Sequence, residues 1–448
     1  MTMHAPEIEA APWEDQAALD DATYRAQIAH LFENSAFYRD KLTAAGFADA
    51  ESVGGLADIA WLPFTEKDEL RATRDEAHPI GTHLAAPMAE VVRIYSTSGT
   101  TGTPSYIPLT AADLESWVEI SQRSYGASGV QQGERMVTTY NAGPFVAGVT
   151  LDAFARLGVC HIPVGAGNTE RLMAAVQLLK PTVLGCTPSY ALHLAEWAEA
   201  RGIDTAGSSV AKILVAGEPG GGEPALRARI EAAWGAKVTE AMGIGDISVS
   251  LWGECERQDG MHFSGRGIVH AELIDPETGD PVPMTDGAEG ELVYTHLRHR
   301  AAPLLRFRSR DRVQVSASPC ACGRTAPRVR CIGRTDDMLI VRGVNLFPTA
   351  IRQVVGEFTP HVSGVILLRP TAMGVKQTPP VPLTVELAEG AAPPADLADR
   401  IRARIRDKLI ATTEVTLVPH GTLPRTDYKS KLVDWSQASR PTPQEDTP

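Results

Sequence analysis

One short segment, YSTSGTTGTPSY (residues 95–106), concentrates hydroxyl side chains and glycines between Thr97 and Pro104. Backbone N–H groups and hydroxyls can donate hydrogen bonds to phosphate oxygens, and glycine lets the backbone approach a ligand closely. A Walker A loop requires the pattern GxxxxGK[ST]. Gly99 and Gly102 do not have that spacing, and no lysine follows them. The segment is therefore either a phosphate-binding loop of another class or an ordinary polar turn.

A second group of residues has the chemistry of metal ligands. One histidine and three thiols occur in the segments CERQDGMH and CACGR, as Cys255, His262, Cys320 and Cys322. These ligand types suit a tetrahedral, structural Zn²⁺ site. The C-x-C spacing is tighter than the usual C-x2-C, so ordinary reduced thiols remain an alternative, and Cys331 is an alternative fourth ligand. Cys160 and Cys186 lie in apolar runs and are expected to be buried core residues.

Three later segments add to the hydroxyl-rich one. They are RFRSRDRV (residues 306–313), GRTDDMLIVRGVNLFP (333–348) and LPRTDYKSK (423–431). In order and spacing, these segments and STSGTTGTP resemble the core motifs of the adenylate-forming enzymes. The segments TPSYAL, AGEP, GECERQDGMH and CACGRTAPR resemble, more narrowly, the phenylacetate-CoA ligase branch of aryl-CoA ligases. This resemblance extends from WLPFTEKDEL to near the C-terminus.

The resemblance implies an ATP-dependent acid–thiol ligase. An aromatic or similar apolar carboxylic acid would be adenylated with release of pyrophosphate, and the acyl group would then pass to coenzyme A with release of AMP. Because the carboxylate and the α-phosphate are both anionic, the reaction needs Mg²⁺ and preorganised donors around the phosphorus. Two alternatives stay open. One is an adenylating enzyme that passes the acyl group to an amine or a carrier protein, and the other is a catalytically silent relative that binds a nucleotide or acyl ligand.

The same resemblance assigns roles to individual residues. Lys429 matches the mobile catalytic lysine, with Lys431 as a competitor, and Asp246 matches the acidic residue that helps to hold Mg²⁺. Asp311 matches the aspartate that accepts hydrogen bonds from the ribose hydroxyls, and Arg334 is its expected partner. The residues implied for ATP or AMP binding are Ser98, Gly99, Thr100, Thr101, Gly102, Thr103, Glu218, Pro219, Met242, Gly243, Asp311 and Arg334.

Movement of the small domain and coenzyme A binding are assigned to the segment after Gly333. Asp336 matches the hinge, which needs only a few residues that tolerate a large change in φ and ψ. Arg342 and Gly343 match positions beside the coenzyme A tunnel.

The acid is expected to lie among the segments YNAGPFVAG, PVGAGNTE and MGIG, whose small and apolar residues suit a flat, apolar molecule. Neither lysine nor arginine occurs in these segments, which disfavours a second carboxylate on the substrate. Tyr140 and Phe145 are candidate walls, although either could equally pack in the core. The implied pocket residues are Tyr140, Ala142, Gly143, Phe145, Gly165, Gly167, Gly243, Ile244 and Gly245.

The chain departs from the resembling family at several positions of these motifs. In AMGIGDIS, Met242 replaces the usual aromatic residue, Gly245 replaces a hydroxyl residue, and the shorter Asp246 replaces a glutamate. Thr103 stands where lysine is common, and the pair 309–310 is Ser-Arg instead of the commoner Thr-Gly. Because Lys429, Asp311, Arg334 and Asp336 are retained, an active but specialised subgroup is favoured over an inactive relative.

The elements that must position these residues can be read from periodicity. Helical spacing of apolar residues covers residues 18–48, and the middle of the chain alternates apolar runs with helical patterns, as in PTVLGC followed by PSYALHLAEWAEARG. Such alternation is typical of βαβ units and a mostly parallel sheet. From Ile268 onward two alternating runs flank a turn rich in Gly, Pro and Asp, which predicts an antiparallel hairpin.

The resulting expectation is an α/β protein with two domains. Residues 1–333 form a large adenylate-forming domain of mostly parallel sheets with helices and an antiparallel β region, and residues 334–448 form a small, mobile α+β domain. In the small domain, helices are predicted near 349–358 and 397–409, and strands near 362–368, 383–387 and 415–418. The tail from about residue 436 is predicted to be disordered.

Composition limits the classes of partner. The 448 residues include 42 Lys and Arg and 55 Asp and Glu, for a net charge of −13, which disfavours binding to nucleic acid phosphates. No apolar run approaches the length of a membrane span, and the acidic start does not resemble a signal peptide. A cytoplasmic enzyme with small-molecule substrates is therefore expected, with a homodimer left open.

Overall fold

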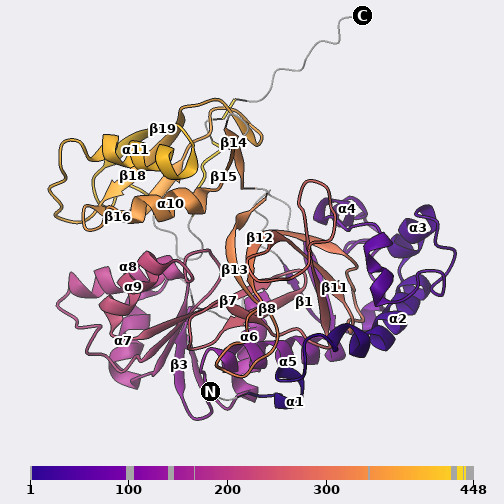
Figure 1. The fold of residues 1–448 in the computed structure, drawn as a ribbon. Helices are drawn as coiled ribbons and strands as arrows, with labels where there is room; N and C mark the ends of the chain where they lie inside the picture. The colour runs from indigo at the N-terminus through magenta and orange to yellow at the C-terminus, as the bar shows by residue number, and fades with distance from the viewer. Residues whose placement is uncertain are drawn as a thin grey trace, which may run out of the picture.

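An 11-stranded mixed sheet forms the centre of the chain, and a smaller unit near the C-terminus packs beside it (Figure 1). The structure is a computed structural model, and it describes residues 3–96, 105–139, 146–165, 167–335, 337–341, 344–424, 431–436 and 438–439. The strand order of the main sheet is β10-β11-β12-β13-β9-β8-β7-β6-β5-β3-β4. The strands from β4 to β7 are parallel, whereas those from β8 to β10 join by antiparallel pairing.

The parallel half is built from alternating strands and helices, as the sequence predicted. Its elements are α5 (Ala111–Ala127), β3 (Arg135–Thr138), η3 (Val146–Gly148), α6 (Val149–Arg156), β4 (Cys160–Pro163), α7 (Thr169–Leu179), β5 (Val183–Cys186), α8 (Pro188–Glu199), β6 (Lys212–Val215), α9 (Pro224–Trp234) and β7 (Lys237–Ile244). Local signals fix several helix starts. Thr187 caps α8 by accepting a hydrogen bond from the Tyr190 N–H, and proline occupies the first turn of both α8 and α9.

The antiparallel half contains the hairpin predicted after Ile268. Its strands are β8 (Ser248–Glu254), β9 (Met261–Phe263), β10 (Val269–Ile274), β11 (Glu289–His296), β12 (Phe307–Ser316) and β13 (Arg328–Arg334). Strand β7 joins the two halves, because Val215 pairs with Glu240 on its parallel side and Ala241 pairs with Gly253 on its antiparallel side. A buried cluster that includes Trp252, Tyr294 and Phe307 packs this half.

The N-terminal residues form helices and a small hairpin. The elements are α1 (Pro6–Glu9), α2 (Gln16–Asn34), α3 (Ala36–Ala44), η1 (Leu56–Trp61), α4 (Lys67–Ala72), η2 (Met88–Glu90), β1 (Val91–Ser96) and β2 (Tyr106–Thr110). Helices α2 and α3 confirm the helical spacing at residues 18–48, and Tyr24, Ile28 and Tyr38 are buried in their own cluster. Strands β1 and β2 pair antiparallel, with Ser96 opposite Tyr106.

The C-terminal unit is α+β, as predicted. It contains β14 (Leu339–Val341), β15 (Val344–Leu346), α10 (Pro348–Gly356), β16 (Val362–Leu368), β17 (Lys376–Gln377), β18 (Val381–Leu387), α11 (Leu397–Leu409) and β19 (Thr413–Val418). The segment PTAMGVKQTPPVP, read from the sequence as a loop, includes the two-residue strand β17, which pairs parallel with β14. In the tail predicted to be disordered, the Ser439 N–H donates to the Thr371 carbonyl at 3.0 Å.

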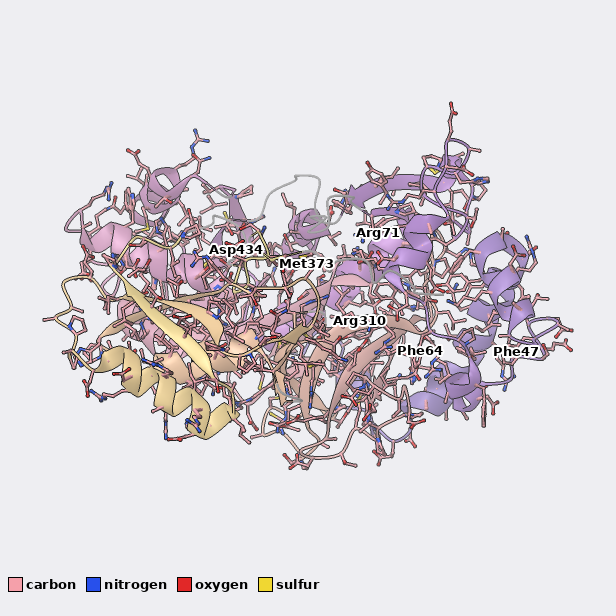
Figure 2. The ribbon with its side chains drawn as sticks, turned by 90° about the horizontal axis from the view of Figure 1, so that it is seen from above. Phe47, Phe64, Arg71, Arg310, Met373 and Asp434 are labelled. Atoms are coloured by element: carbon pink, nitrogen blue, oxygen red, sulfur yellow. The ribbon has the colours of Figure 1, made fainter. Side chains whose placement is uncertain are left out.

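The C-terminal unit lies beside the parallel half, and the N-terminal helices lie at the opposite end of the molecule (Figures 1 and 2). Within the described part of the chain, no helix is both long and apolar enough to cross a membrane.

Candidate functional site

Most of the expected site residues that the structure describes lie at one edge of the main sheet. Parallel strands β3 to β7 end at this edge, and ligands of open α/β sheets bind outside the carboxyl ends of such strands. Glu218 and Pro219 follow β6, Asp246 follows β7, and Gly165 and Gly167 follow β4. The two glycines adopt positive φ values of 86° and 76°, a conformation that glycine accepts without strain.

A second set of expected residues lies outside the described part of the chain. These residues are Ser98, Gly99, Thr100, Thr101, Gly102, Thr103, Tyr140, Ala142, Gly143, Phe145, Asp336, Arg342, Gly343 and Lys429. Their roles stay predictions.

Glu218, expected to border the adenine, also makes a hydrogen bond within the protein. Its Oε1 accepts a hydrogen bond from the Ser189 N–H at 2.8 Å, at the start of α8, where the partial positive charge of the helix favours a carboxylate. The loop that carries Glu218 also touches the C-terminal unit, because Arg352 of α10 donates to the Pro219 carbonyl at 2.7 Å and to Glu223 Oε1 at 2.6 Å. The expected adenine-binding loop is therefore held from both sides.

The segment Met242–Gly245 ends β7 and begins the turn to β8. A Cβ atom added to Gly243 would lie 2.0 Å from the Val249 carbonyl oxygen, so no other residue fits there without movement of β8. Close packing against β8 therefore requires glycine at position 243, independently of its expected place beside the nucleotide and the acid. Met242 and Ile244 are half-buried and pack against the cluster of the antiparallel half.

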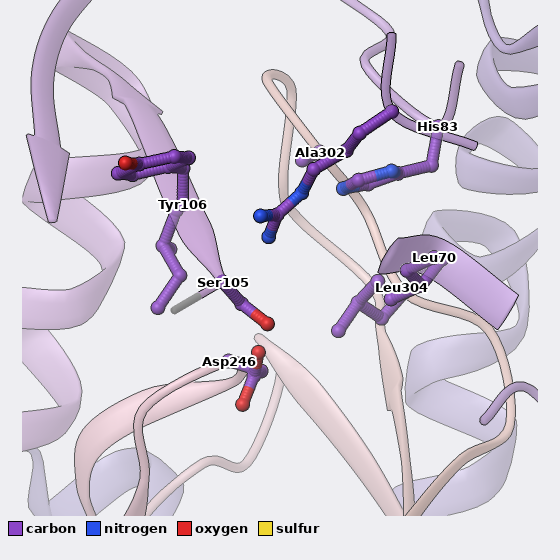
Figure 3. A pocket seen from close by; sticks show the side chains of 9 residues that line it. Leu70, His83, Ser105, Tyr106, Asp246, Ala302 and Leu304 are labelled. Carbon is purple, nitrogen blue, oxygen red and sulfur yellow. The ribbon is translucent and has the colours of Figure 1, made fainter. Parts of the chain in front are cut away.

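Asp246 is paired with a lysine that the sequence analysis did not select. Lys67, the first residue of α4, places its Nζ atom 2.7 Å from Asp246 Oδ2, and the Asp246 side chain is 9% exposed. Asp246 also lines a cavity together with Arg74, His83 and Ser105 (Figure 3). Carboxylate and hydroxyl oxygens are ligands that Mg²⁺ accepts alongside water and phosphate oxygens, so these residues fit the expected ion.

Lys67, Arg74 and His83 could have been suspected only weakly from the sequence. The segment TEKDEL begins a helix, with the Glu66 N–H donating to Glu69 Oε2 at 2.7 Å, and the sequence shows no more than such a helix start. Lys67 and Asp246 lie far apart in the chain, so the spacing of residues in the sequence does not predict that they pair.

Asp311 and Arg334 lie opposite each other on strands β12 and β13, as the resemblance implied. Their Cα atoms are register partners, and Arg334 Nη1 lies 2.9 Å from Asp311 Oδ1. The Asp311 side chain is 10% exposed, so the carboxylate is largely withdrawn from water and held in one direction. An oriented carboxylate of this kind can accept hydrogen bonds from two neighbouring hydroxyls of a ribose.

The unusual Arg310 occupies a backbone conformation that favours glycine. Its φ is 67°, which explains why glycine is the commoner residue at this position in the resembling family. Arg310 has a compensating contact, since its Nη2 donates to Glu66 Oε2 at 2.6 Å, next to Lys67. The substitution therefore ties β12 to the start of α4.

The four predicted metal ligands come together in space. The ligand atoms of Cys255, His262, Cys320 and Cys322 all lie within 4.8 Å of one another. Cys255 Sγ lies 3.7 Å from Cys320 Sγ, and Cys322 Sγ lies 3.3 Å from His262 Nε2. A hydrogen bond from the Cys255 thiol lowers the pKa of Cys322, so this cluster readily holds a thiolate.

The remaining cysteines are not part of this cluster. Cys331, the alternative fourth ligand, directs its thiol to the Gly333 carbonyl, and burial raises its pKa. Cys186 is fully buried, as expected, whereas Cys160 is exposed, contrary to the expectation of a core residue. Strand β4 lies at the edge of the main sheet, which leaves Cys160 on the surface.

Two family models and four curated relatives match this chain. The family model of AMP-binding enzymes matches residues 12–296, and that of the AMP-binding enzyme C-terminal domain matches residues 343–434. Phenylacetate-coenzyme A ligase of Thermus thermophilus is 35% identical over 95% of this chain and 97% of its own length.

Solved structures of a second ligase in two states allow the arrangement of the C-terminal unit to be compared. A 2-hydroxyisobutyryl-CoA ligase in the postadenylation state is 27% identical, covers 96% of this chain and 92% of its own, and superposes with a TM-score of 0.88. A structure of the same ligase in the thioesterification state superposes with a lower TM-score of 0.70. It is 28% identical and covers 97% of this chain and 92% of its own. The overall arrangement of this chain is therefore more similar to the postadenylation structure of that ligase than to its thioesterification structure.

With two matching family models and a relative that spans nearly its whole length, this chain belongs to the AMP-binding, adenylate-forming enzymes and lies in their phenylacetate-CoA ligase-like branch.

Proposed function

We propose that this protein is an AMP-forming acyl-CoA ligase that activates an aromatic or similar apolar carboxylic acid. The observation that carries the proposal is the convergence of Asp246, the loop Glu218–Pro219 and the small residues after β4 at one edge of the sheet. Relatives named as phenylacetate-CoA ligases, one of them covering 95% of the chain, support the activity.

In the first half-reaction the acid's carboxylate attacks the α-phosphorus of ATP, and the bond to the β-phosphate breaks. Asp311, oriented by Arg334, would hold the ribose, and the loop at Glu218 and Pro219 would border the adenine. Asp246 would help to hold Mg²⁺, which neutralises phosphate charge when bound. Lys429 would reach the reacting phosphate and stabilise the charge that develops on its oxygens.

In the second half-reaction the thiol of coenzyme A attacks the acyl-adenylate, forms the thioester and releases AMP. The C-terminal unit would first turn about Asp336, so that Arg342 and Gly343 come beside the coenzyme A tunnel. We propose residue 333 as the end of the large domain, although β13 extends to Arg334.

The acid would lie against Gly165, Gly167, Ile244 and Gly245, together with the segment 140–145. Small residues on two loops leave room for a flat ring, and the three segments expected to form the pocket contain no cationic side chain. These features support an apolar acid such as an aryl or arylalkyl carboxylate.

A pyrophosphate-release screen tests the function. Aryl, arylalkyl and alicyclic acids, together with a branched 2-hydroxy acid, are each supplied with ATP and Mg²⁺, with and without coenzyme A. We expect release that depends on an aryl or arylalkyl acid, and acyl-CoA when coenzyme A is present. Release without acyl-CoA would favour an amine or carrier protein as the acceptor, and no release with any acid would favour a silent relative.

We also propose that Cys255, His262, Cys320 and Cys322 bind a structural Zn²⁺. Three thiolates and one imidazole fill a tetrahedral ion completely and leave no open position for a substrate. The site would tie β8 and β9 to the loop before β13. Metal analysis of the purified protein should give about one equivalent of zinc, and a Cys320→Ser, Cys322→Ser variant should lose it.

A further inference from the structure

A buried histidine contacts the turn that carries Asp246, and no recognised motif includes it. His296 is the last residue of β11 and is only 1% exposed. Its ring joins two segments of the chain, with Nε2 3.0 Å from the Ile247 carbonyl oxygen and Nδ1 3.0 Å from the Leu304 backbone nitrogen. Ile247 directly follows Asp246, and Leu304 lines the cavity beside that aspartate (Figure 3).

These two contacts determine which ring nitrogen of His296 carries the proton. The Leu304 backbone nitrogen is a donor only, so Nδ1 must accept and is unprotonated. Nε2 therefore carries the hydrogen and donates it to the Ile247 carbonyl. Burial, and then the neighbouring His299, lowers the pKa of His296 to about 3, so the ring keeps this form at neutral pH.

Stacking against a second histidine restrains the orientation of the His296 ring. The ring of His299 lies nearly parallel to it, with centres 4.3 Å apart and an angle of 15° between the planes. His299 is 2% exposed, and its Nδ1 lies 3.6 Å from Oδ1 of Asp113 in the first turn of α5. A ring held by a stack and by two backbone groups has little freedom to rotate, so its Nε2–H bond points in one direction.

The turn that His296 contacts is short. The Ile247 N–H donates to the Ile244 carbonyl at 2.8 Å and closes the turn. Between these two residues lie Gly245, expected beside the acid, and Asp246, expected to hold Mg²⁺. Ile247 is fully buried, so loss of the His296 donor would cost free energy, and a shift of the turn would relieve that cost.

We infer that His296 is a positioning residue for adenylation, which holds the Ile247 carbonyl and thereby keeps Asp246 in place for the Mg²⁺ of Mg·ATP. The inference rests on the proposed function, since it is the adenylating reaction that gives Asp246 its expected role. Lys67 pairs with the carboxylate of Asp246, whereas His296 holds the backbone that follows it. The side chain and the backbone of this aspartate are thus restrained separately.

Two substitutions separate the contacts of His296. Glutamine can place its amide nitrogen near the position of Nε2, so His296→Gln keeps a donor for Ile247 and leaves the Leu304 N–H without its acceptor. Asparagine is one carbon shorter and can place Oδ1 near the position of Nδ1, so His296→Asn keeps the contact with Leu304 and loses the donor to Ile247. Each variant loses one buried hydrogen bond, so the melting temperatures of both should fall by similar amounts.

Calorimetry with Mg·ATP and with AMP then tests the inference. In His296→Asn the affinity for Mg·ATP should fall about 2- to 13-fold, the effect of one neutral hydrogen bond, and the affinity for AMP should stay within about twofold. In His296→Gln both affinities should stay within about twofold of the wild type. Unchanged Mg·ATP binding in His296→Asn, an equal loss in the two variants, or an equal loss of Mg·ATP and AMP would overturn the inference.

A wild-type measurement covers the case in which His296→Asn does not fold. The Nε2–H signal of His296, observed by NMR with ¹⁵N-labelled histidine and assigned by its loss in His296→Gln, should shift when Mg·ATP is added and not when AMP is added. A signal that responds to neither nucleotide, or to both equally, would count against the positioning role.

Thr205→Val is the matched control. Thr205 lies before β6, at the opposite end of this strand from the expected site, and is 7% exposed. Its hydroxyl donates to the Ala233 carbonyl at 2.7 Å. The substitution removes one buried hydrogen bond between a side chain and the backbone, so it should lower the melting temperature and leave both affinities unchanged.

The calorimetry uses no carboxylic acid, so its outcome is separate from that of the pyrophosphate-release screen. A wild type that releases no pyrophosphate with any acid would refute the ligase, and the comparison of His296→Asn with His296→Gln would still decide whether His296 positions Asp246. Acid-dependent release together with equal Mg·ATP affinities in the two variants would keep the ligase and refute the positioning role.

Discussion

The contact of Arg352 with the loop after β6 should favour the arrangement of the C-terminal unit needed for adenylation. Arg352 donates to Glu223 Oε1 at 2.6 Å and to the Pro219 carbonyl at 2.7 Å, and the two charged side chains are only 9% and 19% exposed. The thioesterification structure of the 2-hydroxyisobutyryl-CoA ligase superposes less well than its postadenylation structure, with TM-scores of 0.70 and 0.88, so we expect this contact to be lost if the C-terminal unit turns. Arg352 is therefore expected to act as a positioning residue for one half-reaction only.

The size of the effect follows from the two hydrogen bonds. A net contribution of about 1.5 to 3 kcal/mol is typical for a hydrogen bond to a charged group, and partly exposed Glu223 would regain some hydration after Arg352→Gln. A loss of about 2 kcal/mol changes the population ratio of the two arrangements roughly 30-fold. That factor is the upper limit on the rate effect, and it is reached only if the present arrangement is the less populated one in the wild type; the effect becomes smaller as this arrangement becomes more strongly favoured.

Separate assays of the half-reactions measure it. Rapid-quench pyrophosphate release without coenzyme A should slow by up to about 30-fold in Arg352→Gln, whereas thioester formation from supplied acyl-adenylate should be unchanged or faster. Arg404→Gln is the matched control, since it breaks an exposed contact with Glu357 inside the C-terminal unit. Equal slowing of both half-reactions, or no slowing of either, would refute the reasoning.

Three further predictions follow from the site and its surroundings. Lys429→Ala should abolish acid-dependent pyrophosphate release and spare thioester formation from supplied acyl-adenylate, and an equal loss of both would exclude this division of roles. Removal of zinc by a chelator should lower the melting temperature of the wild type, whereas the variant Cys320→Ser, Cys322→Ser should start low and not respond. Burial lowers the pKa of His296 to about 3 in the folded protein. As pH falls below about 6.5, His296 is therefore protonated in the unfolded chain before it is protonated in the folded chain. Its contribution to the free energy of unfolding should decline by up to about 1.4 kcal/mol per pH unit down to about 3, and His296→Asn should show a shallower decline in urea titrations at stepped pH.

The sequence predicted the elements well because each has a local signal. The helix at α11 has the predicted bounds, since its apolar residues Leu397, Ile401 and Ile405 recur at helical spacing and are buried. The strands predicted near 362–368 and 383–387 correspond to β16 and β18, which pair in the small sheet. The four predicted metal ligands, which the structure brings together, could be selected from the sequence because two of them share each of two short segments.

What the sequence did not predict depends on contacts between distant segments. Cys160 was placed in the core because its neighbours are apolar, but the exposure of a strand residue depends on which strand ends the sheet. Lys67 and Arg352 look like ordinary surface cations on short helices, and Arg74 looks like one in a loop. Only the folded chain brings Lys67 to Asp246 and Arg352 to Glu223, and neither pair has a periodic signal.

Strand β12 connects residues from both ends of the large domain that are expected to act on one nucleotide. Asp311, expected to bind ribose, lies in the middle of this strand, and the start of the strand holds the segment before α4. Thr65 is fully buried there, with its N–H donating to the Arg306 carbonyl at 2.9 Å and its hydroxyl to the Leu305 carbonyl at 2.6 Å. The Arg310–Glu66 contact adds a second connection.

This connection links the strand that carries Asp311 to Lys67 and, through Lys67, to Asp246, the expected Mg²⁺ ligand. Lys67 follows Thr65 by two residues, so a shift of Lys67 away from Asp246 should disturb the hydrogen bonds of Thr65, which are buried and therefore costly to lose. A valine at position 65 would keep the volume and remove the hydroxyl. In calorimetry this Thr65→Val variant should lose more affinity for Mg·ATP than for AMP, because Lys67 positions Asp246, the expected ligand of the Mg²⁺ that accompanies ATP; an equal loss for both nucleotides would contradict this link.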